Sequence, residues 1–160
     1  MSSIKGFHQG WFKPKNPEKV ARPKDGFMRS TKLNEGVLQI QYKSSLEERF
    51  MRYCDINKHI TRYALEPFPI YYISPLDRQE HRYYVDFMIC FDNGASLLVE
   101  IKPYKQTIPP IKPKQDSNKL KRRYQNELAT YAVNLAKWDA ARHFCSKKGL
   151  KFAIITEKEL

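Results

Sequence analysis

The sequence is poor in the features that mark secreted, membrane-spanning and zinc-binding proteins. Its three cysteines, Cys54, Cys90 and Cys145, lie far apart, and they form no C-x-x-C pair and have no histidine nearby at zinc-ligand spacing. The first residues contain no apolar stretch of signal-peptide type, and no run approaches the roughly 18 apolar residues that span a bilayer. We therefore expect a cytoplasmic protein with reduced cysteines in its core.

Acidic residues are also scarce, because 17 Asp and Glu stand against 29 Lys and Arg and give a formal net charge of +12. A chain of 160 residues fits one globular domain, and this charge favours a polyanionic partner, nucleic acid before all others. The charge is uneven: residues 33–100 are mildly acidic, between basic flanks over 1–32 and 101–125. A metal-dependent nuclease needs carboxylates in its centre, whereas a protein that only wraps DNA does not. A basic surface without a DNA role is the alternative.

Glycine and proline interrupt residues 1–34 so often that neither helical nor strand periodicity persists there. We expect a basic, irregular N-terminal arm over 1–34 and a globular domain over 35–160 that carries the nuclease centre. Phe7, Trp11 and Phe12 are too apolar for a free tail, so the arm should pack on this domain or on a partner.

The rest of the pattern predicts an α/β fold in which a helix, a β-hairpin, a second helix and a strand follow one another. Apolar side chains recur every three or four residues from Leu120 to Trp138, so we expect this whole helix face in the core. The expected bounds are 45–57 for the first helix with Ser44 or Ser45 as N-cap, 63–73 for an extended edge segment, 82–91 and 96–102 for the hairpin around Asp92-Asn93-Gly94, 103–116 for a proline- and lysine-rich exposed loop, Ser117 to Gly149 for the long helix, and 151–156 for a buried strand.

Two carboxylates and a lysine come together in the predicted hairpin. Strand alternation puts Glu100 and Lys102 on one face, and Asp86 interrupts the apolar run of the partner strand, which would bring it beside Glu100. Two adjacent carboxylates repel each other unless a divalent cation lies between them. Taken alone, E-x-K is common in charged proteins, and a surface ion pair on an edge strand would produce it equally well.

A third acid comes from the first helix. At 100° per residue, Glu47 lies about 60° from the centre of the apolar stripe and Glu48 about 160° away, so only Glu47 should reach the sheet. Gln125 of the long helix is a further candidate, although a polar helix face explains it equally well.

Glu47, Asp86 and Glu100-Ile101-Lys102 resemble the active site of the PD-(D/E)XK nuclease superfamily, with Val85 in place of the usual proline. The resemblance implies a restriction-endonuclease-like core, a mixed sheet flanked by helices. The segment from Tyr42 to Glu47 resembles the nuclease subunit of Tn7-type transposases. A longer set resembles the head completion nucleases of T-even-like tailed bacteriophages: Gly6-Phe7, Gln9-Gly10, Phe12, Asn16-Pro17, Tyr42 to Phe50, Tyr72-Ile73-Ser74-Pro75, His81-Arg82-Tyr83, Asp86-Phe87 and Glu100-Ile101-Lys102-Pro103.

These resemblances imply a DNA endonuclease that uses Mg²⁺ or Mn²⁺ and has Glu47, Asp86, Glu100 and Lys102 as catalytic residues. The expected metal ligands are Asp86, Glu100, Glu47 and the backbone carbonyl of Ile101. The implied role is in phage head completion after DNA packaging, in the cytoplasm of the infected host or in the virion, with portal or neck proteins as partners. The alternatives are a DNA-binding virion or neck protein without essential cleavage, and a recombination subunit that cuts only with a transposase partner.

Basic residues after the hairpin form the expected contact with DNA. They lie in the proline-rich loop and at the start of the long helix, where an extended chain can follow a phosphate backbone without reading sequence. The expected DNA-binding residues are Lys105, Lys112, Lys114, Lys119, Lys121, Arg122 and Arg123.

Overall fold

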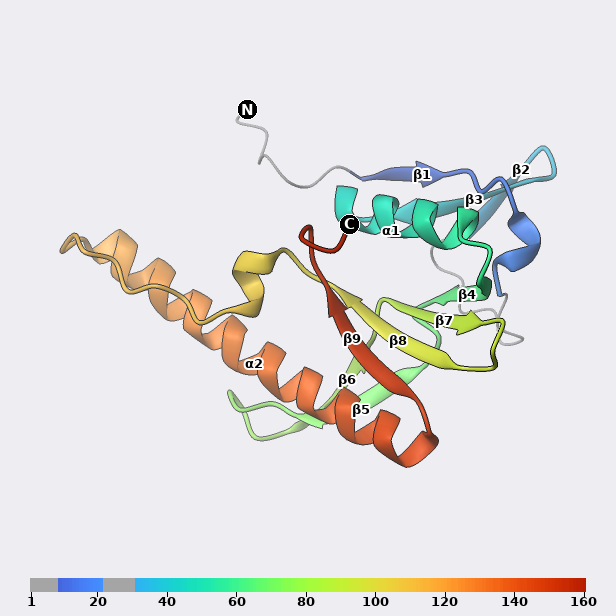
Figure 1. Ribbon diagram of the computed structural model, residues 1–160. Coiled ribbons are helices and arrows are strands. Elements are labelled where there is room, and N and C mark those ends of the chain that lie inside the picture. The colour runs from blue at the N-terminus through green and yellow to red at the C-terminus, as the bar shows by residue number, and fades with distance from the viewer. Residues whose placement is uncertain (1–8, 22–30) are drawn as a thin grey trace.

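A four-stranded mixed sheet with the strand order β4-β7-β8-β9 lies at the centre of the structure (Figure 1). Three of its strands are antiparallel neighbours, and β9 runs parallel to β8. The computed structural model describes residues 9–21 and 31–160. The strands of this sheet are β4 (Ile60–Leu65), β7 (Phe87–Phe91), β8 (Ser96–Ile101) and β9 (Lys151–Ile155).

A second, three-stranded sheet leads into the first helix. Its strands are β1 (Gly10–Phe12), β2 (Thr31–Asn34) and β3 (Val37–Tyr42), in the order β1-β3-β2, and all are antiparallel. Helix α1 (Ser45–Ile56) follows β3 directly, and Ser44 caps it by accepting a hydrogen bond from the Glu47 N–H at 3.2 Å. The predicted helix is confirmed. Its face with Phe50, Met51 and Cys54 is buried in the core.

The N-terminal arm is not irregular over its described part, so that prediction was wrong for β1 and β2. Strands of three and four residues are too short to show an alternating pattern. A domain boundary at residue 34 would also separate β2 from β3, its hydrogen-bonded neighbour. The described segment packs on the domain, where Phe12 and Val20 are buried, whereas Phe7 lies outside the described residues.

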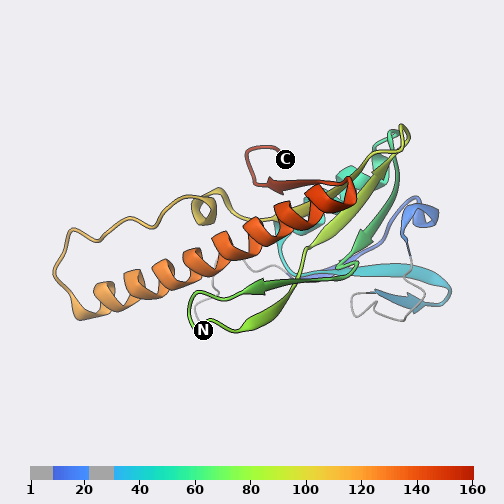
Figure 2. The ribbon, with the colours of Figure 1, turned by 90° about the horizontal axis from the view of Figure 1, so that it is seen from below.

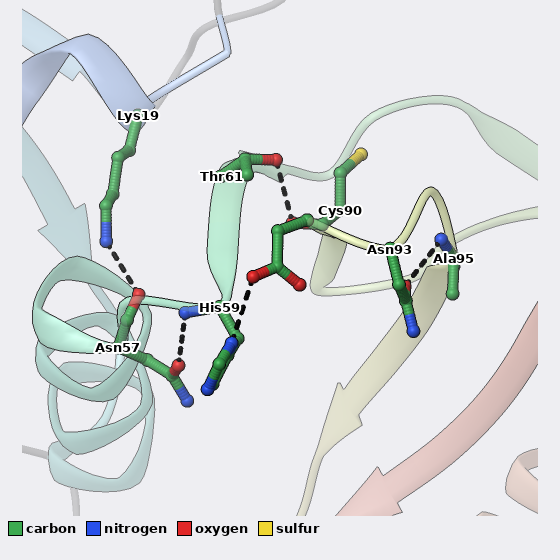
Figure 3. Close-up of polar contacts among 8 residues, drawn as sticks. Lys19, Asn57, His59, Thr61, Cys90, Asn93 and Ala95 are labelled. Atoms are coloured by element: carbon green, nitrogen blue, oxygen red, sulfur yellow. Dashed lines mark hydrogen bonds and ion pairs between the residues drawn. The ribbon is translucent and has the colours of Figure 1, made fainter.

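Backbone and side-chain hydrogen bonds hold this segment in place. Lys15 and Asn16 come directly before the 3-10 helix η1 (Pro17–Lys19). Their N–H groups both donate to the buried Asp55 carboxylate at 2.8 Å. The ammonium of Lys19 donates to the backbone oxygen of Asp55 at 2.8 Å. It also donates to the backbone oxygen of Asn57 at 2.8 Å, at the end of α1 (Figure 3). A cation at a helix C-terminus is favourable for the helix dipole.

The turn between β7 and β8 lies beside this helix end (Figure 3). His59 Nδ1 is 2.9 Å from Asp92 Oδ2, and the His59 N–H donates to Asn57 Oδ1 at 2.9 Å. Asn93 accepts from the Ala95 N–H at 2.9 Å, and Gly94 has φ +85°, which suits glycine. The predicted hairpin turn is confirmed.

The predicted continuous strand over 82–91 is wrong, because the chain bends at Val85 and Asp86 and changes sheet there. Before the bend, β6 (Glu80–Tyr84) pairs with β5 (Pro69–Ile73) in a separate hairpin, and after it β7 pairs with β4. The Glu66 N–H donates to the Asp86 carbonyl at 2.9 Å. This bond joins the bend at Asp86 to the connection between β4 and β5, where Glu66 lies. The predicted edge segment over 63–73 is likewise divided between β4 and β5. A uniform strand composition conceals such a change of pairing partner.

Helix α2 (Asn118–Lys148) begins at the predicted cap Ser117 and ends at Gly149, whose φ of +69° closes it in the left-handed conformation. Only its second half lies in the core, where Asn134, Trp138, Ala141 and Cys145 are buried. No helix within the described residues is both long and apolar enough to cross a membrane.

The predicted core stripe is therefore wrong for the first half of α2. A 31-residue helix is about 46 Å long, whereas a strand of six residues covers about 20 Å, so the sheet cannot cover the helix. The first half projects from the body, and the loop after η2 (Tyr104–Thr107) runs outward along it to the tip, where the helix begins (Figures 1 and 2). A groove of about 1080 Å³ lies between the loop and the helix, lined by Ile108, Pro110, Tyr124 and Tyr131 among others.

Candidate active site

Asp86 and Glu100 lie next to each other because of the register of β7 and β8. Phe87 pairs with Val99, so the preceding residue, Asp86, comes beside Glu100 at the end of the two strands. The carboxylate oxygen Oδ2 of Asp86 accepts a hydrogen bond from the Ile101 N–H at 2.8 Å. The structure thus brings together the two acids that the sequence pattern paired, although Asp86 lies in the bend and not within a strand.

Glu100 is held from two sides. Its residue is 5% exposed, its Oε2 accepts a hydrogen bond from the Tyr83 hydroxyl at 2.6 Å, and its Oε1 is 3.5 Å from the Lys102 ammonium. Glu100 and Lys102 share one side of the chain, as alternation predicted. The backbone of Lys102 is fixed as well, since its N–H donates to the Ile155 carbonyl at 3.1 Å.

The electrostatics of this pair favour the uncharged forms. Burial raises the pKa of Asp86 well above its ordinary value, and the negative charge of Glu100 raises it further, while the Ile101 N–H opposes the shift. Asp86 keeps some exposed surface, but its carboxyl group is closely surrounded by protein atoms. Burial also raises the pKa of Glu100, against the hydrogen bond from Tyr83 and the charge of Lys102. Both shifts show negative charge without sufficient compensation.

Glu47 of α1 reaches the same region. Its Oε2 accepts from the Lys43 N–H at 2.9 Å, and it lines one small hollow together with Glu66 and Asp86. Burial raises the pKa of Glu47, and the charges of Glu66 and Glu100 add to this shift. Glu48, by contrast, pairs with Arg52 at 2.6 Å one turn along the helix. The structure therefore separates Glu47 from Glu48 in the way the helical wheel indicated.

The donor set suits a hard divalent cation. Among the described residues, no group of three or more His, Cys, Asp and Glu side chains is arranged to hold a metal ion. Mg²⁺, however, keeps several water ligands and is commonly held by one or two carboxylates. Asp86 and Glu100 provide two adjacent carboxylates whose raised pKa values a cation would reverse.

Lys137 is a site residue that the sequence reasoning missed. It lies in the second half of α2, half-buried, with its ammonium 5.8 Å from the centre of the Tyr72 ring and 5.5 Å from that of Tyr83. Burial lowers the pKa of Lys137 and the charge of Lys102 lowers it further, whereas the charges of Glu100 and Asp86 oppose both. The sequence shows that Lys137 precedes the core residue Trp138, but it does not show that Lys137 packs on the β5–β6 hairpin.

Gln125, suggested above as a helper from α2, is exposed in the projecting half of the helix. Two other neighbours of the site also went unrecognised. Lys43 forms an ion pair with Glu66 at 3.1 Å, and Tyr83 comes from the separate β5–β6 hairpin. Both lie in segments that carry the family resemblance, but their place in the site depends on how the sheets are joined.

Residues 57–157 match the family described as TnsA-like endonuclease N terminal. The chain belongs to this family. It is also 36% identical over 122 residues to the head completion nuclease of Enterobacteria phage T4, an alignment that covers 76% of this chain and 81% of that protein. Domains of the TnsA-like family have the restriction-endonuclease-like fold, so the predicted fold class and resemblance are confirmed.

The TnsA-like match includes Asp86, Glu100 and Lys102, whereas Glu47 lies before its first residue. The match therefore covers the acidic pair and its lysine together with β4, β7, β8, α2 and β9. It identifies the chain as a nuclease domain.

The seven predicted DNA-binding residues are all exposed. Lys119, Lys121, Arg122 and Arg123 lie at the tip of the projecting half of α2. Arg123 is about 21 Å along the helix from Lys137, at 1.5 Å per residue. Lys121 forms an ion pair with Asp116, and Arg123 pairs with Glu127 at 3.0 Å. The other three, Lys105, Lys112 and Lys114, lie in η2 and in the loop that leads from η2 to the tip of α2.

Proposed function

We propose that this chain is a metal-dependent DNA endonuclease that hydrolyses phosphodiester bonds at Asp86 and Glu100 and acts in phage head completion. One observation carries the enzymatic part: two adjacent, enclosed carboxylates with raised pKa values lie beside Lys102 in a TnsA-like endonuclease domain. Such a pair has no evident structural use, because burying two like charges together lowers stability.

Asp86 and Glu100 would hold Mg²⁺ or Mn²⁺, with Glu47 and the Ile101 carbonyl as further ligands. When bound, the ion supplies Lewis-acid stabilisation of the phosphate and lowers the pKa of a bound water. The protein's own residues keep the ligands in position: the Ile101 N–H holds Asp86, and the Tyr83 hydroxyl holds Glu100. Lys102 places a positive charge where negative charge develops on the phosphate, or orients the attacking water.

The DNA would extend from this site towards the tip of α2. Lys119, Lys121, Arg122 and Arg123 supply positive charge at the start of α2. Further along the same helix, Lys137 lies beside Tyr83, which bonds to Glu100, so one duplex that follows the helix would contact both regions. The +12 net charge suits such a partner.

The biological part of the proposal comes from the T4 relative, which is named a head completion nuclease. Similarity over most of both chains supports the same role here, in the infected host cell, with DNA as substrate and portal or neck proteins as partners. Expression of this chain should restore plaque formation by phage T4 that lacks its own head completion nuclease. The Asp86→Ala variant should not restore it. If the unaltered chain and Asp86→Ala both restored plaque formation, cleavage at Asp86 would not be needed for head completion.

The direct test incubates the purified chain with supercoiled plasmid in Mg²⁺, in Mn²⁺ and in EDTA. We expect nicked and linear products with either metal and none with EDTA. A recombination subunit that depends on a partner would bind DNA but cut only when that partner is added. A structural DNA-binding protein would bind in all three conditions and never cut, which would overturn the enzymatic proposal.

A further inference from the structure

Lys137 lies outside the Glu100-Ile101-Lys102 motif, yet its charge acts on Glu100 and it borders the same site. It projects from α2 onto the β5–β6 hairpin, where the rings of Tyr72 and Tyr83 lie 5.8 and 5.5 Å from its ammonium. The same Tyr83 donates its hydroxyl hydrogen bond to Glu100. One tyrosine therefore borders Lys137 with its ring and holds a candidate metal ligand with its hydroxyl.

The two lysines of the site differ in their partners. Lys102 is 3.5 Å from Glu100 Oε1, so its charge is engaged by a carboxylate. Within residues 9–21 and 31–160, the ammonium of Lys137 forms no ion pair and no side-chain hydrogen bond. It lies near the two rings, and the charges of Glu100 and Asp86 act on it without forming an ion pair. A half-buried ammonium without an acid partner keeps its capacity to bind an anion.

The charges of the cluster indicate which anion. Asp86, Glu100 and Glu47 carry three formal negative charges when ionised, and Lys102 and Lys137 carry two positive charges, so the five groups together have a charge of −1. With a divalent ion held by the carboxylates, the site is positive and attracts a phosphodiester. The phosphate gains negative charge as water attacks, and a fixed ammonium stabilises that charge more than the ground state.

We propose that Lys137 is a second catalytic lysine, whose ammonium binds a non-bridging oxygen of the scissile phosphate while Lys102 remains with Glu100. This inference rests on the proposed nuclease function. In this role Lys137 neither gives nor takes a proton, and the rings of Tyr72 and Tyr83 hold its side chain in place before DNA binds.

The test compares Lys137→Gln and Lys137→Arg with Lys147→Gln, which removes the same charge from an exposed position in the last turn of α2. Single-turnover cleavage of a defined duplex is measured in Mg²⁺, and duplex affinity is measured in Ca²⁺. We expect Lys137→Gln to cut about 100-fold more slowly, as expected for the loss of one group that stabilises developing charge. Its affinity should stay within about threefold, since one of several phosphate contacts is lost. Lys137→Arg should recover most of the rate.

A second readout addresses contact with the phosphate itself. A single phosphorothioate is placed at the mapped cleavage position, in each of its two stereoisomers. The isomer that directs sulfur at Lys137 should slow the unaltered protein and have little further effect on Lys137→Gln. An equal effect of that isomer on both proteins would overturn the contact.

The inference is overturned if Lys137→Gln cuts within about tenfold of Lys147→Gln, or if Lys137→Arg is as slow as Lys137→Gln. Should Lys137→Gln not fold, Lys137→Met keeps the aliphatic stem against the two rings and is held to the same limits. Failure of the nuclease proposal is distinct, because the unaltered protein would then not cut at all. An active protein that is inactivated by Asp86→Ala but not by Lys137→Gln would overturn the Lys137 inference alone.

Discussion

The Tyr83 hydroxyl lies 2.6 Å from Glu100 Oε2 and donates to it across the junction of two sheets. This bond lowers the pKa of Glu100 against the effect of burial. In Tyr83→Phe the pKa of Glu100 should therefore rise, and cleavage should require a higher pH. A pH–rate profile with its acid limb shifted upward would support this, and Tyr71→Phe, on the exposed side of the same hairpin, is the control. An unshifted limb would show that Tyr83 does not act through Glu100.

The acidic pair should be indispensable for cleavage but not for folding. Asp86→Ala and Glu100→Ala are each expected to reduce plasmid cleavage by at least about 1000-fold, because each removes a ligand of the proposed ion. Asp92→Ala, an exposed acid in the turn of the same hairpin, serves as the matched control and should cut normally. Activity within about tenfold of the unaltered protein in both variants would refute the assignment.

Two neighbouring glutamates of α1 provide a matched pair. Glu47→Gln should impair cleavage strongly, because Glu47 lines the hollow with Asp86. Glu48→Gln should leave cleavage intact and lose only the ion pair with Arg52, with a small effect on stability because Arg52 is exposed to solvent. Cleavage rates and melting temperatures of both variants check this. The opposite ranking would place the active side of α1 on the Glu48 face.

The metal-free protein should become more stable as the pH falls from neutral. Asp86 and Glu100 have raised pKa values in the folded state, so folding favours their protonated forms. Their destabilising contribution is full above the folded pKa values and disappears as the pH falls through them towards the ordinary carboxylate range. Melting temperatures in EDTA should show this rise, and it should be smaller in Asp86→Asn. A fall in melting temperature over the same range, equal in both proteins, would contradict the expectation.

Binding of DNA should depend on the tip of α2 and weaken steeply with salt. If four basic residues reach phosphates, the slope of log affinity against log salt should be about −3 to −4 on duplex DNA. Replacing Lys119, Lys121, Arg122 and Arg123 together by Gln should flatten this slope. Replacing Lys147 and Lys148 by Gln, at the other end of the helix, should change it less. An unchanged slope in the quadruple variant would move the DNA contact to the basic N-terminal region.

Local chemistry made parts of this fold predictable. Ser44, Ser117 and Gly149 cap their helices through bonds with residues a few positions away, so both helices were placed within about one residue. The pairing of Asp86 with Glu100 followed from a hairpin whose turn is equally local. These features need no knowledge of distant segments.

Features that depend on distant segments were beyond the sequence reasoning. The bend at Asp86 exists because the chain changes from β5 to β4 as its pairing partner. Lys137 belongs to the site only because α2 packs on the β5–β6 hairpin that carries Tyr72 and Tyr83. The apolar stripe from Leu120 to Trp138 is present in the sequence, but it lies in the core only over the second half of α2, because the strands are shorter than the helix.

The projecting half of α2 also fixes the distance between two places that would contact DNA. Arg123 and Lys137 are separated by about 21 Å of rigid helix, and DNA advances about 3.4 Å for each base pair. A duplex bound at both residues would contact Arg123 about 6 base pairs from the bond that is cut, on one side of that bond only. Cleavage would then require about 6 base pairs of duplex between the cut bond and a DNA end on that side. A DNA end would therefore keep a segment of fixed length that the protein does not remove.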